Sequence, residues 1–287
     1  MVCSRMLLGE FCSCLSGPII RITPDELHIQ DSAYHETMYS PNRPFNKPEK
    51  IAHRFENPLS AFATPDHAKH HQRRSALNPF FSKKKVAQFS PEIQMSMQKI
   101  LARLEQEYVG TGRVLSLNRM WGCLSSDTIV AFAFERHYDF VESPEFHSAL
   151  NRAMIDLLEP NHWLVNVPLV ARIFQLLPDS AVRYLQPQMD SVIHLNTTFQ
   201  TGTLQYRNWT IPAGTMVSMD TYAVCHDEEI FPDSFSFIPE RWLGNPKAPD
   251  GQQLSRYMVS FGQGTPSCTG IQLGYAKLYI GLANFFR

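Results

Sequence analysis

The chain has 287 residues, of which 44% are hydrophobic and 18% are charged. This balance is typical of globular proteins long enough to bury a sizeable core. Its 26 basic and 27 acidic side chains leave a formal net charge of −1, which argues against nucleic acid as a partner. Six scattered cysteines are too few for a disulfide scaffold and fit a reducing compartment.

The start of the chain gives no sign of regular structure. Residues 1–16 show no periodicity, so we expect an irregular lead-in. The short apolar run at residues 6–8 is interrupted at once by Gly9 and Glu10, and no run reaches the length needed to cross a bilayer. We therefore expect no membrane anchor and no signal peptide in the chain as given.

Regular structure is expected from residue 17 onward. Residues 19–22 predict a strand and residues 25–29 its partner. The run Thr64-Pro65-Asp66 combines an N-cap, a proline and an acid, which predicts a helix that ends just before Pro79.

Three further helix starts are expected in the middle of the chain. Ser90-Pro91-Glu92 repeats the same pattern, and apolar residues then follow at helical spacing through residue 108. Residues 117–131 predict a buried helix, and Ser143-Pro144-Glu145 predicts the start of another. Residues 160–178 are expected to form a long connection, followed by a helix kinked at Pro187.

The last third of the chain has fewer helical patterns and more turn and loop signals than the middle. Residues 209–218 predict a hairpin that turns at Ala213-Gly214. A loop-rich stretch follows, and the chain closes with a helix from Ile271 to about Asn284. The fold class expected is mainly α with small β-sheets (α+β).

The most informative segment is the glycine-rich run at residues 261–270, just before the last helix. Gly262 and Gly264 allow a tight backbone bend that brings N–H groups together. Cys268 stands at the entrance of the helix, where the positive end of the helix dipole favours a thiolate. A thiolate held in this way is a good ligand for iron.

This run resembles the haem-binding loop of the cytochrome P-450 family, in which a Phe, two Gly, an Arg, the Cys ligand and a Gly follow one another. The matching positions are Phe261, Gly262, Gly264, Cys268 and Gly270. Pro266 stands in place of the arginine that pairs with a haem propionate, and Thr269 in place of a small apolar residue. Proline has no side-chain donor, so one charge-assisted contact to the cofactor is lost.

Other segments resemble the same family. Residues 237–242 resemble its proline-Glu-Arg loop, and residues 211–215 resemble its Ile-Pro-Ala-Gly segment. His70 and Arg74 fall where the family has a Trp and an Arg for the propionates. The opening at residues 17–27 resembles members of fungal secondary metabolism.

The resemblance implies a haem-thiolate monooxygenase with haem b (iron protoporphyrin) held at its iron by Cys268. It implies oxidation of a small lipophilic secondary metabolite, electrons from an NADPH-dependent reductase, and no nucleic-acid partner. Family members are associated with the endoplasmic reticulum and face the cytosol. Without an anchor, this chain is expected to be cytoplasmic or loosely membrane-associated.

Relative to the family, two internal parts are missing. The Ala-Gly-acid-Thr core of the central oxygen-activating helix is absent, and no arginine of the sequence has a glutamate three residues before it. We therefore expect a partial cytochrome P-450 fold, in which an N-terminal part (residues 17–200) joins a C-terminal haem-loop part (residues 201–287) across an internal deletion. No catalytic residue is identifiable, Arg241 is expected to lack its family partners, and oxygenase activity is expected to be poor or absent.

Three alternatives stay open at this point. The chain is a catalytically inactive remnant that binds no haem productively, or it binds a nucleotide through the turn at Gly262 and Gly264. The second alternative is weak, because Ser267 and Pro266 do not suit a dinucleotide turn. The third is a metal site at His67, His70 and His71, which share a helix face, although incidental histidines are commoner there.

Overall fold

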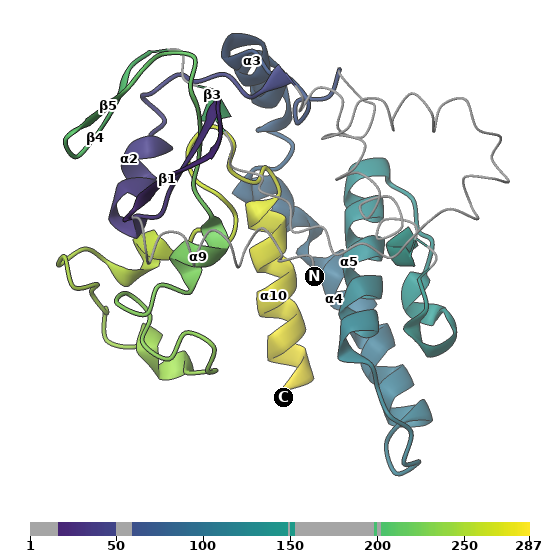
Figure 1. Cartoon of the computed structure of the whole chain (residues 1–287). Coiled ribbons are helices and arrows are strands. Elements are labelled where there is room, and N and C mark those ends of the chain that lie inside the picture. The colour runs from purple at the N-terminus through teal and green to yellow at the C-terminus, as the bar shows by residue number, and fades with distance from the viewer. Residues whose placement is uncertain (1–16, 50–58, 149, 153–197, 200–201) are drawn as a thin grey trace, which may run out of the picture. The chain divides into compact units, whose positions relative to one another are not determined.

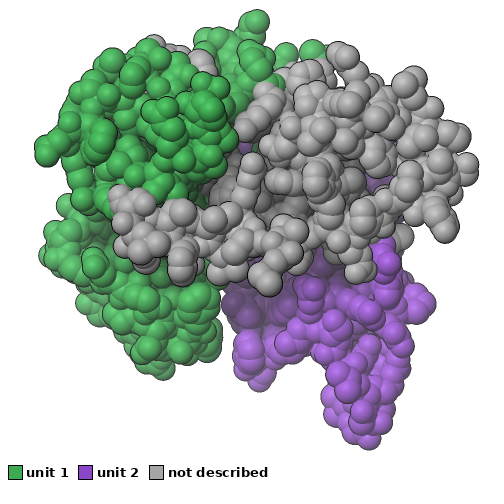
Figure 2. Space-filling model, in the orientation of Figure 1, with its two compact units in different colours: residues 1–74, 192–268 green, residues 75–191, 269–287 purple. Residues whose placement is uncertain are grey.

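The computed structural model describes residues 17–49, 59–148, 150–152, 198–199 and 202–287. It divides into two compact units, each built from two segments of the chain. Unit 1 comprises residues 1–74 and 192–268, and unit 2 comprises residues 75–191 and 269–287 (Figure 2). The expected lead-in, the connection at residues 160–178 and the helix kinked at Pro187 lie outside the described residues.

Unit 1 is organised around a small sheet of four strands in the order β1-β2-β6-β3 (Figure 1). Strands β1 (Ile19–Thr23) and β2 (Glu26–Ile29) are partners, as expected from the sequence, and they pair antiparallel. Strand β6 (Met216–Ser218) pairs parallel with β2 and antiparallel with β3 (Thr198–Phe199). Strands β2 and β6, which are almost 200 residues apart in sequence, are therefore neighbours in this sheet.

The hairpin expected across Ala213-Gly214 is wrong. Strand β5 (Trp209–Ile211) pairs with β4 (Leu204–Tyr206) in a separate two-stranded sheet, whereas β6 joins the larger sheet. The pair turns at residues 207–208, where Arg207 adopts a left-handed φ of 48°. Gly214, with φ of 85°, instead redirects the chain from one sheet to the other.

Short helices complete unit 1 and enclose its two apolar clusters. They are η1 (Ser32–Tyr34), α2 (His35–Met38), α9 (Thr221–Cys225), η5 (Pro239–Trp242) and η6 (Leu254–Tyr257). The first cluster joins the sheets to α2 through buried residues such as Met38, Tyr39 and Val217. The second lies under the loop-rich stretch and includes Phe231, Leu254 and Val259.

Unit 2 is helical, with α4 (Lys83–Glu107), α5 (Leu117–Phe134) and α10 (Ile271–Phe285) as its main elements. The expected helices at residues 117–131 and 271–284 are confirmed. Helix α3 (His67–Leu77), which begins in unit 1, ends before Pro79 as expected. Its start differs from the expectation, because the side chain of Asp66, and not of Thr64, accepts a backbone N–H of the first turn, from Lys69 at 2.8 Å. Gly281 lets α10 approach α5 closely, because a Cβ there would lie 2.6 Å from the ring of Trp121.

The two helix starts predicted from the Ser-Pro-Glu runs at residues 90–92 and 143–145 are wrong. Helix α4 begins at Lys83 after the N-cap Ser82 and runs straight through Pro91. The apolar residues Val86, Ile93, Met97 and Ile100 are all buried on α4, and their burial offsets the hydrogen bond that proline cannot donate. Residues Pro144–Phe146 form only a 3-10 turn, η4, because Glu145 and Phe146 have left-handed φ values near 50°.

The core of unit 2 is apolar and largely aromatic. Met97, Met120 and Phe146 belong to one cluster, together with the short helix η3 (Phe140–Glu142). The ring of Phe132 packs against Phe80, Phe81 and Phe89 in another. The expected class, mainly α with small sheets, is confirmed. Within the described ranges, no helix combines the length and apolar character that a membrane crossing requires.

Candidate functional site

The glycine-rich loop at residues 261–270 is folded by its own backbone hydrogen bonds. The N–H of Cys268 donates to the carbonyl oxygen of Phe261 at 2.7 Å, which closes the loop. Ser267 N–H donates to Gly264 O at 3.2 Å inside it. Gly262 and Gly264 have φ of 71° and 65°, the left-handed region that favours glycine. The sequence expectation of a tight glycine-dependent bend is therefore met.

Gly264 also permits a close approach that the sequence did not indicate. A Cβ at this position would lie 1.9 Å from the carbonyl oxygen of Tyr39, far inside van der Waals contact. At Gly262 the nearest atom, Cα of Ser267, would be 3.5 Å away, an ordinary contact. Gly264 is thus required by packing of the loop against the protein itself.

A side-chain link holds the same loop to helix α2. His35 and Gln263 share a hydrogen bond of 2.8 Å between Nδ1 and Oε1, and Gln263 Nε2 donates to the carbonyl oxygen of Arg256 at 3.2 Å. Burial lowers the pKa of His35. Because Gln263 Oε1 can only accept, Nδ1 of His35 is the donor in this hydrogen bond.

Arg74 reaches the loop from helix α3. Its guanidinium donates to the carbonyl oxygen of Ser267 at 2.5 Å and to the Ser267 hydroxyl at 3.4 Å. Burial lowers the pKa of Arg74, and the negative charge of an ionised Cys268 acts in the opposite direction. The structure therefore brings Arg74 to the residue before Cys268 and within electrostatic reach of its thiol.

His70, one turn earlier on α3, lines a pocket with residues of the loop. The pocket has an empty volume of about 190 Å³ and is lined by Phe45, Lys47, Pro65, His67, His70, Thr265 and Pro266. Only 6% of His70 is exposed, and burial together with the nearby cations lowers its pKa to about 4. A lysine, two imidazoles and no carboxylate thus surround this space.

Lys47 is the member of this pocket that sequence reasoning missed. Its ammonium donates to the carbonyl oxygen of Phe62 at 2.8 Å. Burial, and then the charge of Arg74, lower its pKa to about 8. Lys47 lies between Asn46 and Pro48 in an irregular segment, so no periodicity or motif marked it.

Cys268 and Gly270 occupy the two ends of the transition into α10. The Cys268 thiol is free and exposed. Gly270 is the N-cap of α10, with φ of −84°, a conformation open to any residue. Cys268 was expected just before the last helix, and α10 begins three residues later, at Ile271.

The donor set fits haem, although the described pocket does not enclose it. A soft thiolate suits iron, and Lys47, His70 and Arg74 suit carboxylate groups. The empty volume of the pocket, about 190 Å³, includes space open to solvent, so the pocket is not an enclosed cavity. The described residues therefore supply contacts on one side of such a cofactor.

Arg241 is not left without partners. Its guanidinium donates to the carbonyl oxygens of Pro232 at 2.9 Å and Asp233 at 3.2 Å. These bonds cap the preceding loop and replace the expected family partners. No group of three potential ligands among the described residues is arranged to hold a metal ion, and His67, His70 and His71 form no such group.

Comparison with known proteins gives a consistent result. The cytochrome P-450 family model matches residues 28–201 and 199–287. Cytochrome P-450 monooxygenase orf4 of Eupenicillium brefeldianum is 31% identical over 94% of this chain and 78% of its own length. Cytochrome P-450 monooxygenase tpcC of Cochliobolus heterostrophus is 26% identical over 94% of this chain and 76% of its own.

The family match covers nearly the whole chain and includes the loop that carries Cys268. The first relative aligns over 396 positions, more than the chain has residues, so the alignment contains gaps in this chain. The fold, the glycine-dependent loop and these matches agree: the chain belongs to the cytochrome P-450 family.

Proposed function

We propose that the chain binds haem b with the Cys268 thiolate as the axial ligand of iron. The observation that carries the proposal is an exposed thiol on a preformed loop, with the cation Arg74 beside it. The loop is closed by the Cys268–Phe261 hydrogen bond and packed against Tyr39. The sulfur is then already exposed on a folded loop.

The residues around the loop have separable roles in this proposal. Cys268 supplies the sulfur, and Gly262 and Gly264 set the bend that exposes it. Arg74 and Lys47 supply positive charge for the two carboxylate groups of the cofactor. His70, whose pKa of about 4 leaves it neutral near pH 7, supplies only a ring N–H donor. Lys47 lines the same pocket as Pro266 and so provides a cation where the family arginine is lacking. Thiolate-ligated haem supplies the chemistry for activating oxygen.

We further propose that oxygenase activity toward a small lipophilic substrate, with an NADPH-dependent reductase, is low. The sequence has neither the Ala-Gly-acid-Thr core nor a Glu-x-x-Arg pair. An internal deletion near residues 200–201 accounts for both losses. The proposal is supported by the family match in two segments that meet at residues 199–201 and by the 396-position alignment. Sequencing the transcript across the codons for Gln200 and Thr201 tests the deletion.

Haem uptake and ligation are tested by spectroscopy on the purified chain. After haem is added, the reduced protein under carbon monoxide should show the red-shifted absorbance of thiolate-ligated haem. Cys268→Ala should lose that band. Cys225→Ala is the matched control, because Cys225 is also a free cysteine of unit 1 but is half-buried, and its sulfur lies 3.8 Å from the hydroxyl of Ser260, outside the loop itself. This variant should keep the band.

Two results would overturn the assignment. If the unmodified chain takes up no haem, it is the inactive remnant that the sequence left open. If Cys268→Ala keeps the band, another group holds the iron. Rapid turnover of a lipophilic substrate with reductase would contradict the proposed low activity while leaving the ligand assignment intact.

A further inference from the structure

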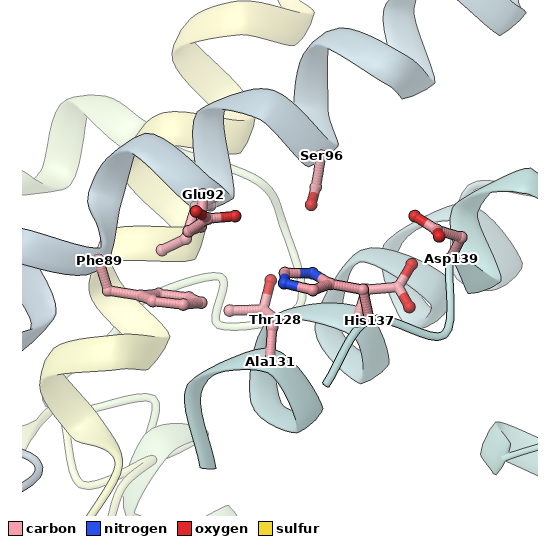
Figure 3. Close-up of a pocket in the computed structure, with 9 residues that line it drawn as sticks. Phe89, Glu92, Ser96, Thr128, Ala131, His137 and Asp139 are labelled. Carbon is pink, nitrogen blue, oxygen red and sulfur yellow. The ribbon is translucent and has the colours of Figure 1, made fainter. Parts of the chain in front are cut away.

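A second pocket lies in unit 2, between helices α4 and α5, and no residue of the haem-binding loop lines it (Figure 3). Its empty volume, which includes space open to solvent, is about 300 Å³. Glu92 and Ser96 come from α4, and Thr128 from α5. His137 and Asp139, on the turn after α5, form the exposed rim.

The floor of this pocket holds a polar group without a partner. Thr128 is 2% exposed, and its hydroxyl makes no hydrogen bond to any described residue. Figure 3 shows the hydroxyls of Ser96 and Thr128 directed into the space between the two helices. A buried hydroxyl left unsatisfied costs about 1–3 kcal/mol, so a ligand atom that bonds to Thr128 would relieve a cost already present.

The charges that surround this hydroxyl are negative. Glu92, Asp127 and Asp139 are the three carboxylates that line the pocket. Asp139 is neutralised by Lys99, whose Nζ lies 2.6 Å from Oδ1. Asp127 accepts the N–H groups of Phe140 and Val141 at 2.9 and 2.8 Å, so its oxygens are engaged. Glu92 is therefore the carboxylate of the pocket whose charge is not offset by a hydrogen bond or ion pair within the described part of the chain.

The remaining wall is apolar. Figure 3 shows the ring of Phe89 on the side of the pocket away from Asp139, and Ile93 and Ala131 also line the pocket. An aromatic face attracts an organic cation, and the aliphatic groups suit a short hydrocarbon tail. A bare divalent metal ion fits poorly, because no three ligands among the described residues are arranged around a point.

We infer that this pocket binds the ammonium group of a small primary amine. The ammonium donates to the Thr128 hydroxyl, the Ser96 hydroxyl and the Glu92 carboxylate. Its alkyl chain lies against Phe89 and Ala131. An ammonium has three donors and no acceptor, which matches this set of oxygen acceptors. The site is independent of haem and of Cys268.

The inference is tested with n-butylamine at pH 7.5, where the amine is protonated. Binding to the whole chain is followed by ligand-observed NMR titration. Glu92→Gln should weaken binding about ten-fold, the effect of one hydrogen bond to a charged group. Thr128→Val, which keeps the side-chain shape, should weaken it by a similar factor. Glu105→Gln is the control, because it removes the same charge from an exposed position on α4 outside the pocket.

Each contrary outcome would overturn the inference. These outcomes are no binding of n-butylamine, equal weakening by Glu92→Gln and Glu105→Gln, equal binding of uncharged n-butanol, and displacement of the amine by millimolar magnesium. If Thr128→Val fails to fold, as judged by circular dichroism, the pair of glutamate variants still decides. Glu92 is half-buried near the middle of a long helix, so Glu92→Gln is expected to fold.

Discussion

The two pockets described above differ in the sign of the charges that line them and in whether their polar groups have hydrogen-bond partners. The pocket beside the haem-binding loop has Lys47 and two histidines on its wall. Lys47 and the neighbouring Arg74 already donate to backbone carbonyls. The pocket of unit 2 has three carboxylates on its wall and a buried hydroxyl with no partner among the described residues. The first is suited to an anionic group and the second to a cationic one.

Changing a glycine of the haem-binding loop should break the first pocket and leave the second intact. Gly264→Ala places a methyl group 1.9 Å from the Tyr39 carbonyl oxygen at φ of 65°. Overpacking and left-handed strain together should lower the free energy of unfolding by about 3–4 kcal/mol. Chemical denaturation measures this loss, and haem uptake should fall with it.

Gly262→Ala is the matched control for that change. It has nearly the same φ, 71°, but its nearest contact would be 3.5 Å away. Only the conformational cost of about 1 kcal/mol is then expected. Equal destabilisation by the two alanines would show that backbone strain, and not contact with Tyr39, governs the loop. Amine binding in unit 2 should be unaffected by either.

The buried histidine of the first pocket should make stability depend on pH. The pKa of His70 is lowered to about 4 in the folded chain, against about 6.5 when unfolded. Between these values the unfolded chain takes up a proton that the folded chain does not. The free energy of unfolding should therefore fall as the pH falls, by about 2 kcal/mol between pH 7 and pH 5.

His70→Gln isolates this contribution, because glutamine does not titrate. The variant should be flatter than the unmodified chain over the same pH range when both are followed by urea denaturation. Parallel curves for the two proteins would place the proton uptake on another group and remove His70 from the account.

The smallest effect expected concerns the wall of the second pocket. Asp127 is 8% exposed and accepts two backbone N–H groups. Asp127→Asn turns one acceptor into a donor that faces an N–H, so unfolding should become easier by about 1–2 kcal/mol. Asp139→Asn removes only an exposed ion pair with Lys99 and should change stability by less than about 1 kcal/mol. Thermal unfolding measures both.

The sequence predicted elements well where a periodic apolar pattern agreed with a local end signal. Helix α3 ends before Pro79 as expected, and α5 and α10 follow the apolar pattern. At Pro91 the two signals disagreed, and tertiary burial along α4 prevailed over the local preference of proline. Ala213-Gly214 does carry a turn, but strand pairing is decided by distant partners, which for β6 are β2 and β3.

In the candidate site, too, local features could be predicted from the sequence and long-range contacts could not. Residues 261–268 could be located from their glycine spacing and resemblance, because that information is local. Lys47, Tyr39 and His35 lie more than 200 residues away from the loop in sequence. Their roles depend on contacts that only the fold creates. The same holds for Thr128, whose missing hydrogen-bond partner has no signature in the sequence.

The bond between Arg74 and the Ser267 carbonyl has a consequence for any acidic group that approaches this guanidinium. The incoming group must compete with an acceptor that belongs to the backbone one position before the cysteine. Arg74 would then form a hydrogen bond to the incoming acid as it breaks its hydrogen bond to the carbonyl oxygen. If Arg74 pairs with a carboxylate of a cofactor, it must give up its hydrogen bond to the Ser267 carbonyl oxygen. The segment that carries Cys268 would then be held less firmly while the cofactor binds.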